Sequence, residues 1–247
     1  MSREILAPLA RLISTAEAID GLRDLFAAEE PLEDVAVRVA ETALAAIPFA
    51  DAVSITALSW PDARTMASTH ERALELDRHQ YASGHGPCLE AAWQRAPVCT
   101  AIDDEHQRWP EFVEAARRLG IHASLSVPLL IDAQDDKQEL LGSLNVYSQT
   151  ASAFDPFDAQ LMRLYTAAAG QAISNAGRWQ ESRETVTQLE SALLSRSNID
   201  MAKGALIAMH GCDPSAAFAR LVDESQRRNI KVRDLAAEML ARLQVAA

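Results

Sequence analysis

The sequence predicts an α+β fold, in which an antiparallel sheet with flanking helices precedes a long coiled-coil-type connecting helix and a C-terminal three-helix bundle. Three observations support this prediction. Five strand-like segments lie before residue 150, and they seldom alternate one by one with helical segments, which disfavours a parallel wound sheet. Residues 158–213 contain no proline, so one or more long helices are expected there. Apolar stripes with helical spacing recur after residue 199.

The elements of the first part follow from periodicity and from helix-breaking residues. A helix is expected over 32–47, because apolar residues recur four apart between two prolines. Strands over 51–59 and 65–70 flank a Trp-Pro-Asp turn and are expected to pair as an antiparallel hairpin. The remaining expected helices are 71–81, 88–95 and 111–119, and the remaining expected strands are 98–101, 124–131 and 140–147.

The proline-free stretch carries a short heptad pattern. Trp179, Val186 and Leu193 are seven residues apart, and Leu189 lies three residues after Val186. This seam predicts a parallel homodimeric coiled coil. The alternative is a helix that packs on its own domain, and the sequence leaves both open.

The last segment is expected to form three helices. Gly211 ends the first, and Asp213 with Pro214 supplies a cap and a first-turn proline for the second. Each helix carries one apolar stripe. A bundle this small is marginal alone, so support from the preceding long helix is expected.

Composition excludes several classes of protein. The chain has 247 residues, of which 49% are hydrophobic and 23% are charged, as in globular proteins. No apolar run approaches the roughly 20 residues of a membrane span, and the first residues lack a signal-peptide pattern. We therefore expect a cytoplasmic protein with no membrane partner. Cys88, Cys99 and Cys212 form no C-x-x-C pair and are expected to be reduced thiols.

Charge is distributed unevenly along the chain. The formal net charge of −12 by itself disfavours nucleic acid. The acidity belongs to residues 1–177, because residues 178–247 carry ten Lys and Arg against nine Asp and Glu. Residues 227–233 contain four cations and no acid. This local cluster predicts phosphate binding in the C-terminal part.

The C-terminal stretch resembles the ANTAR family of bacterial transcription antitermination domains. The residues that carry the resemblance are Leu189, Ala192, Leu193, Arg196, Ile199, Ala202, Lys203, Gly204, Leu206, Gly211, Ala217, Phe218, Leu221, Asn229, Lys231, Asp234 and Ala236. The sequence departs from the family in the second helix, where members often carry Leu-Arg and this chain has Leu221-Val222 followed by Asp223-Glu224. These acids are expected to weaken that helix's contribution to RNA binding.

The preceding part looks like a GAF sensor domain of the kind found beside ANTAR domains. The resemblance is carried by Tyr81, Gly84, Gly86 to Ala91, Val127 to Leu129, Leu141, Gly142 and Leu144 to Tyr147. It implies a pocket between the sheet and the helices around residues 81–93, with a small-molecule or signal input whose identity stays unknown. The expected domains are an N-terminal segment (1–18), the sensor (19–177), a connecting helix (178–195) and the RNA-binding domain (196–247).

The resemblance implies an RNA-binding transcription antitermination regulator. The bundle would bind paired stem-loops with six-nucleotide loops in nascent RNA and so prevent formation of an overlapping terminator. Unstacked loop bases are the preferred targets of sequence-specific RNA recognition. The candidate RNA-binding residues are Arg196, Lys203, Arg227, Arg228, Asn229, Lys231 and Arg233.

Two other kinds of function compete with this one. The tail could instead bind DNA or dock a protein, but a major-groove reader needs several base-reaching side chains on one recognition helix. Enzyme motifs are absent from the sequence, since His70-Glu71 lacks a second His at position 74. Thiol chemistry at Cys88 and Cys99 and a metal site at His85 and Cys88 are the weaker alternatives. No catalysis, cofactor or metal is expected.

Overall fold

The computed structural model describes residues 2–26, 29–59, 62–132 and 138–245, and it separates into two units. The first unit is Met1–Gln180 and the second is Glu181–Ala247. A single helix, α7 (Pro156–His210), contributes residues to both units. The proline-free stretch therefore forms one helix of 55 residues rather than several.

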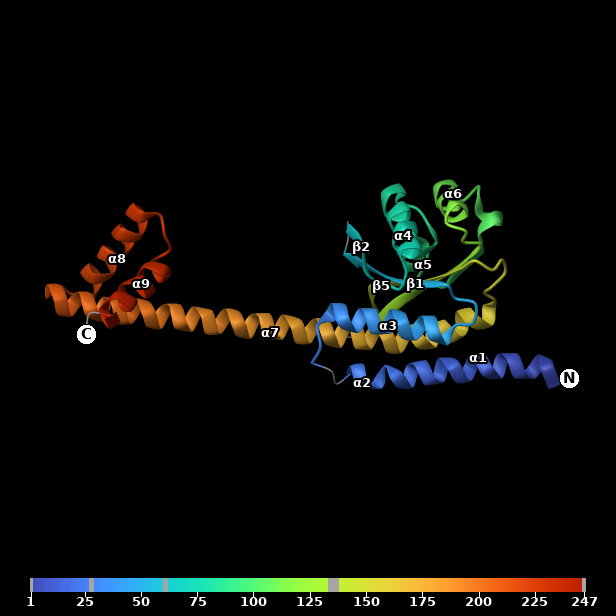
Figure 1. Ribbon diagram of the computed structural model, residues 1–247, viewed down its shortest axis with the longest axis horizontal. Coiled ribbons are helices and arrows are strands. Elements are labelled where there is room, and N and C mark those ends of the chain that lie inside the picture. The colour runs from blue at the N-terminus through green and yellow to red at the C-terminus, as the bar shows by residue number, and fades with distance from the viewer. Residues whose placement is uncertain (1, 27–28, 60–61, 133–137, 246–247) are drawn as a thin grey trace. The chain divides into compact units, whose positions relative to one another are not determined.

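A five-stranded antiparallel sheet forms the centre of the first unit (Figure 1). Its order is β2-β1-β5-β4-β3, so that β5 lies in the middle and pairs with both β1 and β4. The predicted hairpin is confirmed, because β1 and β2 pair antiparallel. The strands are β1 (Ala52–Ser59), β2 (Asp62–Ser68), β3 (Val98–Ala101), β4 (Ala123–Asp132) and β5 (Gln138–Ser148). The α+β fold class is thus as predicted.

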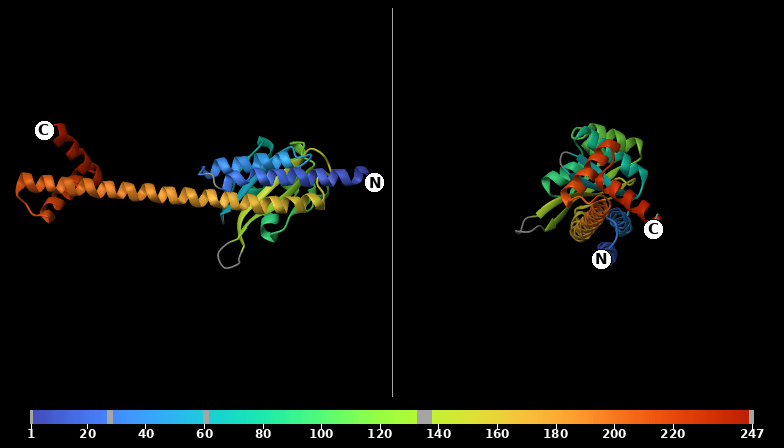
Figure 2. Two further views of the ribbon diagram at one scale, coloured as in Figure 1. Left: turned by 90° about the horizontal axis from the view of Figure 1, so that it is seen from below. Right: turned by 90° about the vertical axis from the view of Figure 1, so that its left-hand side faces the viewer.

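Helices cover both faces of this sheet (Figures 1 and 2). One layer holds α4 (Glu71–Ser83), α5 (Pro87–Gln94) and α6 (Pro110–Arg118), with the short 3-10 helix η1 (Ile102–Glu105). The other holds α1 (Ser2–Gly21), α2 (Arg23–Phe26), α3 (Leu32–Ala46) and the first part of α7. Neither α1 nor α2 is predicted by the sequence pattern.

The sheet face toward α3 and α7 is apolar. Ile55, Leu125 and Leu144 are fully buried there, in one core cluster with Val39 and Tyr165. The Tyr165 hydroxyl donates to the Val39 carbonyl oxygen at 2.7 Å, which joins α7 to α3. Hydrophobic burial on this face fixes the first part of α7 against the sheet.

An ion-pair cluster attaches α1 to the start of α7. The Arg11 guanidinium lies 3.0 Å from Asp155 and 2.9 Å from Asp158. Hydrogen bonds and the positive charge of Arg11 help lower the pKa of Asp155, against the effect of desolvation.

Within the described residues, no helix is long and apolar enough to cross a membrane.

The second unit consists of the end of α7, α8 (Pro214–Arg228) and α9 (Val232–Val245). These are the three predicted helices, and the first of them is continuous with the long helix. Ala202, Leu221 and Leu235 are buried at their centre. The Asp213 carboxylate accepts hydrogen bonds from the backbone N–H groups of Ser215 and Ala216 at 2.9 Å, as expected for the cap of α8.

Gly142 lies on the central strand, and substituting it tests how closely β5 packs against β1. A Cβ atom at this position would overlap the carbonyl oxygen of Thr56 on β1. We expect Gly142→Ala to lower the free energy of unfolding by about 2 kcal/mol or more. Gly177→Ala is the matched control, because a Cβ there meets open space within α7 and should raise stability by up to about 1 kcal/mol. Urea denaturation of both variants measures the difference, and equal midpoints would contradict this account.

Candidate nucleic-acid interface and a buried polar network

Two of the predicted cations lie on α7. Arg196 and Lys203 are seven residues apart and so share a helix face. Both approach Asp200, with Lys203 Nζ at 2.9 Å and Arg196 Nε at 4.0 Å from its carboxylate oxygens. The hydrogen bond and charge of Lys203 lower the pKa of Asp200. Exposed pairs of this kind are weak and screened by salt, so either cation can exchange the carboxylate for a phosphate.

Two further predicted cations, Arg227 and Arg228, end α8. Arg227 pairs with Glu224 one turn earlier on the same helix. Arg228 reaches across to Glu238 on α9, at 2.6 Å. The pKa of Glu238 is lowered chiefly by its hydrogen bond from Arg228. The acids of this chain therefore partly neutralise the predicted basic edge.

The turn between α8 and α9 carries the last three predicted residues. Asn229 ends α8 with a φ of 52°, a left-handed conformation that asparagine tolerates well. Lys231 is exposed, and no carboxylate of the described residues lies within ion-pair distance of it. Arg233 instead lies beside Asp234 and lines a shallow hollow between α7 and α9. The predicted residues are thus spread over two helices, a turn and the start of a third.

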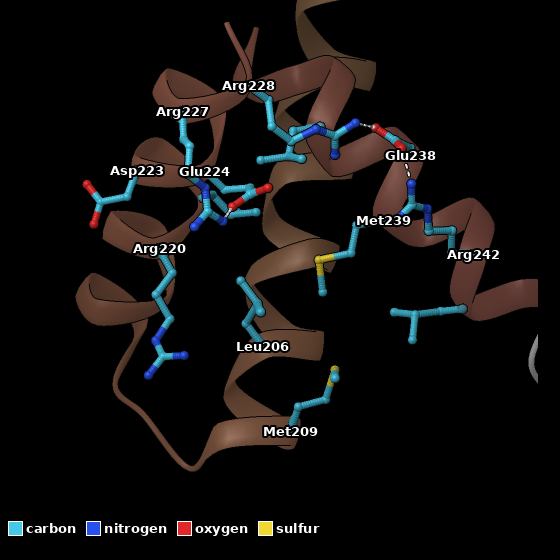
Figure 3. A pocket seen from close by; sticks show the side chains of 13 residues that line it. Leu206, Met209, Arg220, Asp223, Glu224, Arg227, Arg228, Glu238, Met239 and Arg242 are labelled. Atoms are coloured by element: carbon cyan, nitrogen blue, oxygen red, sulfur yellow. Dashed lines mark hydrogen bonds and ion pairs between the residues drawn. The ribbon is translucent and has the colours of Figure 1, made fainter. Parts of the chain in front are cut away.

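A cleft of about 600 Å³ lies between the three helices of the second unit (Figure 3). Apolar side chains of Leu206, Met209 and Met239 line it, and charged side chains surround them. The charged lining residues are Arg220, Asp223, Glu224, Arg227, Arg228, Glu238 and Arg242. The cleft thus joins an apolar floor to a rim with four arginines and three acids.

Arg220 and Arg242 are cleft residues that the sequence analysis missed. Arg220 forms no ion pair with any of the described residues, and Figure 3 shows it extending from α8 without a bonded carboxylate. Its spacing of seven from Arg227 was the available signal, because residues so spaced share one face of a helix. Arg242 pairs with Glu238 on α9. As expected, Asp223 and Glu224 bring negative charge to the same surface.

Three of the four heptad residues of α7 are exposed in the single chain, and the fourth, Trp179, is half-buried. The exposed fractions of Val186, Leu189 and Leu193 are 52%, 59% and 67%. Every residue from 181 to 194 is exposed. This segment of α7 therefore does not pack its apolar seam on its own domain.

The second face of the sheet, toward α4 and α5, is polar although it is buried. Ser54, Thr56, Ser126, Ser143 and Asn145 all lie on this face and are at most 1% exposed. The Asn145 side-chain amide donates to Thr56 Oγ1 at 2.9 Å and to Ser54 Oγ at 3.2 Å. A buried polar network, defined by these five residues with Asp77, Gln80, Tyr81 and Tyr147, thus fills the space beneath the two helices.

Asp77 of α4 is the acidic centre of this network. Its carboxylate accepts hydrogen bonds from the Tyr147 hydroxyl and from Thr65 Oγ1, both at 2.8 Å. The Tyr81 hydroxyl continues the network to Thr65 at 3.0 Å and to Thr56 at 2.8 Å. Burial raises the pKa of Asp77 to about 6 and outweighs these hydrogen bonds, which lower it.

The comparisons with known proteins identify the two units. A model of the GAF domain family matches residues 29–173, which is more than half of the chain. The chain belongs to the GAF family. A model of the ANTAR domain matches residues 187–240. A GAF domain is therefore followed by an ANTAR domain, which is the architecture of a sensor-linked regulator.

Solved structures similar to the GAF domain share little sequence identity with this chain. The reduced form of fRMsr of Staphylococcus aureus is 14% identical, with a TM-score of 0.50 over 64% of this chain and 94% of that chain. The GAF domain of an Acinetobacter phosphoenolpyruvate-protein phosphotransferase is 15% identical, with a TM-score of 0.49 over 68% and 97%. A type II free methionine-R-sulfoxide reductase from Thermoplasma acidophilum is 14% identical, with a TM-score of 0.43 over 57% and 94%. No curated protein matches the chain significantly.

The glycine-rich approach to α5 serves the geometry of the GAF domain. Gly84 ends α4 in the left-handed region, with a φ of 71°. A Cβ at Gly86 would overlap the Gln80 side chain. Gln80 Oε1 in turn accepts a hydrogen bond from the Cys88 backbone N–H at 2.9 Å, which ties the start of α5 to the buried polar network.

The two cysteines considered for thiol chemistry lie on opposite sides of the GAF sheet. Cys88 is buried beneath α5, where desolvation raises the pKa of its thiol well above the usual value. Cys99 of β3 is opposite Leu125, on the apolar face, and its thiol contacts the Phe154 carbonyl oxygen at 3.5 Å. The thiols therefore do not form a reactive pair. Among the described residues, no group of three or more His, Cys, Asp or Glu is placed to hold a metal ion.

The raised pKa of Asp77 predicts a distinctive pH dependence of stability. The folded state holds the proton up to about pH 6, whereas the unfolded carboxyl loses it near its ordinary pKa of 3.8. Between these values the folded state binds more protons, so this group's contribution to stability falls as pH rises, by up to about 1.4 kcal/mol per unit. The side-chain amide in Asp77→Asn does not ionise, so this variant lacks the pH-dependent loss of stability.

We therefore expect Asp77→Asn to gain stability relative to the wild type as pH rises from 4 to 7. Urea denaturation at several pH values measures this difference. Asp103→Asn, at an exposed site, is the control and should show no such gain. Parallel pH profiles for the wild type and Asp77→Asn would refute the raised pKa.

Proposed function

We propose that this protein is an RNA-binding transcription antitermination regulator, in which the GAF domain and a dimer helix control the ANTAR domain. The ANTAR match over residues 187–240 is the observation that carries this proposal. The targets are paired stem-loops with six-nucleotide loops in nascent RNA, whose binding prevents an overlapping terminator. The protein acts in the cytoplasm as a regulator and not as an enzyme.

The cations of the ANTAR domain are assigned to RNA contacts. Lys203 and Lys231 are the strongest candidates, because they lie on the matched family pattern and Lys231 is exposed without an ion pair to the described residues. Neutralising phosphates supplies most of the salt-dependent affinity for nucleic acid. The other proposed contacts are Arg196, Arg227, Arg228, Asn229 and Arg233.

The cleft offers a second kind of contact to RNA. Its apolar floor of Leu206, Met209 and Met239 suits the face of an unstacked base, and the arginines at its rim suit the phosphates on either side. Loops present such bases, whereas a duplex stacks them inside the helix. Arg220 is added to the proposed RNA contacts on this ground.

A signal-responsive DNA-binding regulator is the nearest alternative. Reading a major groove requires several base-reaching side chains on one recognition helix. The cations of this ANTAR domain are distributed over α7, α8, α9 and the turn at Lys231. This distribution favours a folded RNA with phosphates and bases at several angles. Docking of a protein partner is the remaining alternative.

The domain assignments follow from the same proposal. Residues 19–177 act as the sensor after an N-terminal segment of residues 1–18. Residues 178–195 connect it to an RNA-binding domain at residues 196–247. The exposed heptad seam of α7 joins two copies, so that two ANTAR domains are presented to paired stem-loops.

Removing the two lysines tests the RNA interface. We expect Lys203→Ala combined with Lys231→Ala to weaken binding to a looped RNA hairpin. The slope of log affinity against log salt should fall by about two, because two phosphate contacts are lost. Filter binding at several salt concentrations measures both effects.

The matched control removes two exposed cations from the first unit. Arg23→Ala combined with Arg78→Ala should leave hairpin affinity and salt slope unchanged. Unchanged binding by the lysine variant would show that the interface lies elsewhere. Tighter binding to duplex DNA than to the hairpin, at the same salt, would favour the alternative function.

Two neighbouring leucines of α7 test the dimer. Leu193 lies on the heptad seam and Leu194 lies beside it, and both are 67% exposed. We expect Leu193→Lys to shift the protein to monomer in sedimentation experiments, because a charge in the seam opposes helix association. Leu194→Lys should remain dimeric. A wild type that stays monomeric with and without RNA would rule out the dimer.

A further inference from the structure

The Asp77 carboxylate of the GAF domain is fully buried and lacks a cationic partner among the described residues. The titratable groups that face it are Tyr81 from α4, Cys88 from α5 and Tyr147 from β5. Burial raises the pKa of all three, so they are neutral at pH 7 and bring no positive charge. An ionised carboxylate in such a place is costly unless a positive charge accompanies it.

Three polar atoms on the polar face of the sheet are also buried without a hydrogen-bond partner among the described residues. They are Ser126 Oγ, Ser143 Oγ and Asn145 Oδ1. The Asn145 amide nitrogen already donates to Ser54 and Thr56, so only its acceptor oxygen remains. Buried polar atoms of folded proteins nearly always have partners, so three together require an explanation.

The three atoms adjoin one another on the polar face of the sheet. Ser126 of β4 and Ser54 of β1 lie on either side of Asn145 of β5 in the strand register. Ser143 is two residues from Asn145 and opposite Thr56. Directly paired side chains of this kind have Cβ atoms about 4.5–5.5 Å apart. The unpartnered atoms therefore form one cluster.

The same cluster reaches the carboxylate. Ser54 accepts a hydrogen bond from Asn145 and lies close enough to Asp77 to lower the pKa of its carboxyl. Thr56, Tyr81 and Thr65 make a second connection between Asn145 and Asp77. One negative charge, one amide oxygen and several hydroxyls thus belong to a single hydrogen-bonded network on this face. The opposite face of the sheet is apolar, and its described residues include no such arrangement.

We propose that this cluster binds a compact cation rich in N–H donors, of the ammonium or primary-amine class, between the GAF sheet and helices α4 and α5. An ammonium group carries the charge that Asp77 lacks and donates in several directions at once. It supplies a hydrogen to Asn145 Oδ1 and satisfies the two serine hydroxyls. An anion is disfavoured by the carboxylate, and a bulky quaternary cation has no N–H to donate.

Binding of this cation gives the GAF domain an input that involves no RNA. Asp77 and Gln80 lie on α4, and Gln80 holds the start of α5 through Cys88. A cation at Asp77 therefore contacts the network that positions both helices over the sheet. Its binding competes with the proton on the same carboxylate.

Thermal unfolding of the full chain tests the proposal. Ammonium chloride and methylammonium chloride are compared at pH 7.5 with sodium, potassium and tetramethylammonium chloride at equal ionic strength. We expect ammonium to raise the unfolding midpoint by about 3 °C or more at tenfold its dissociation constant, and the midpoint to keep rising with the logarithm of ammonium concentration. Below pH 6 the apparent affinity should fall by up to about tenfold per pH unit, because the proton occupies Asp77.

Matched variants locate the effect. Asp77→Asn should abolish the rise specific to ammonium, and Ser143→Ala should weaken it. Asp103→Asn, which removes an exposed carboxylate of the same domain, should retain it. Proton spectra of the wild type with ¹⁵N-labelled ammonium provide a readout that does not depend on the folding of any variant. Bound ammonium should show protons protected from solvent exchange.

Several outcomes would overturn the proposal. An equal rise with sodium, potassium or tetramethylammonium would show a general salt effect. Retention of the ammonium effect by Asp77→Asn would place the cation elsewhere. No effect of any cation, together with no protected ammonium protons, would mean that water alone satisfies the cluster. None of these results depends on RNA binding.

Discussion

Burial of one apolar sheet face constrains most of this structure. The central strand β5 and its neighbours present Ile55, Leu125 and Leu144 to α3 and to the first part of α7. Because these side chains leave water only when the helices cover them, the start of α7 becomes part of the GAF core. The same helix later contributes Ala202 to the core of the ANTAR domain. One helix therefore supplies a packed face to each domain.

The other sheet face follows a different physical rule. Its residues are as deeply buried, but hydroxyl, amide and carboxylate groups replace the hydrocarbon side chains. Such groups stabilise a fold only when hydrogen bonds replace those lost to water. Tyr147 and Asp77 meet this requirement through hydrogen bonds, whereas Asn145 meets it only in part. The face toward α3 and α7 therefore stabilises the GAF domain by hydrophobic burial. The face toward α4 and α5 depends on hydrogen bonds.

In the ANTAR domain, charge is balanced locally rather than concentrated. Arg227 and Arg228 each lie against a glutamate, while Arg220 and Lys231 form no ion pair with the described residues. Exposed pairs are weak, so a polyanion can displace the carboxylates at modest cost. The free cations and the apolar cleft are the features on which the proposed RNA binding rests.

The sequence by itself determined the two families and most of the elements, with α1 and α2 as the exceptions. Apolar periodicity and proline positions predicted five strands and the main helices, because these signals act over a few neighbouring residues. The motifs around Gly86 and Lys203 predicted GAF and ANTAR domains, which the family models confirm. Arg227 and Arg228 were predicted at what proves to be the rim of the cleft.

Only the tertiary structure decided which side chains meet. The strand register places Ser126 and Ser54 beside Asn145, although these residues are far apart in the chain. Packing of three helices creates the cleft and adds Arg220 to it, while Arg233 lies at a separate hollow. Unpaired polar atoms and shifted pKa values arise from burial, and burial is set by contacts between distant segments. Local sequence patterns do not predict those contacts, because the segments that meet are far apart in the chain.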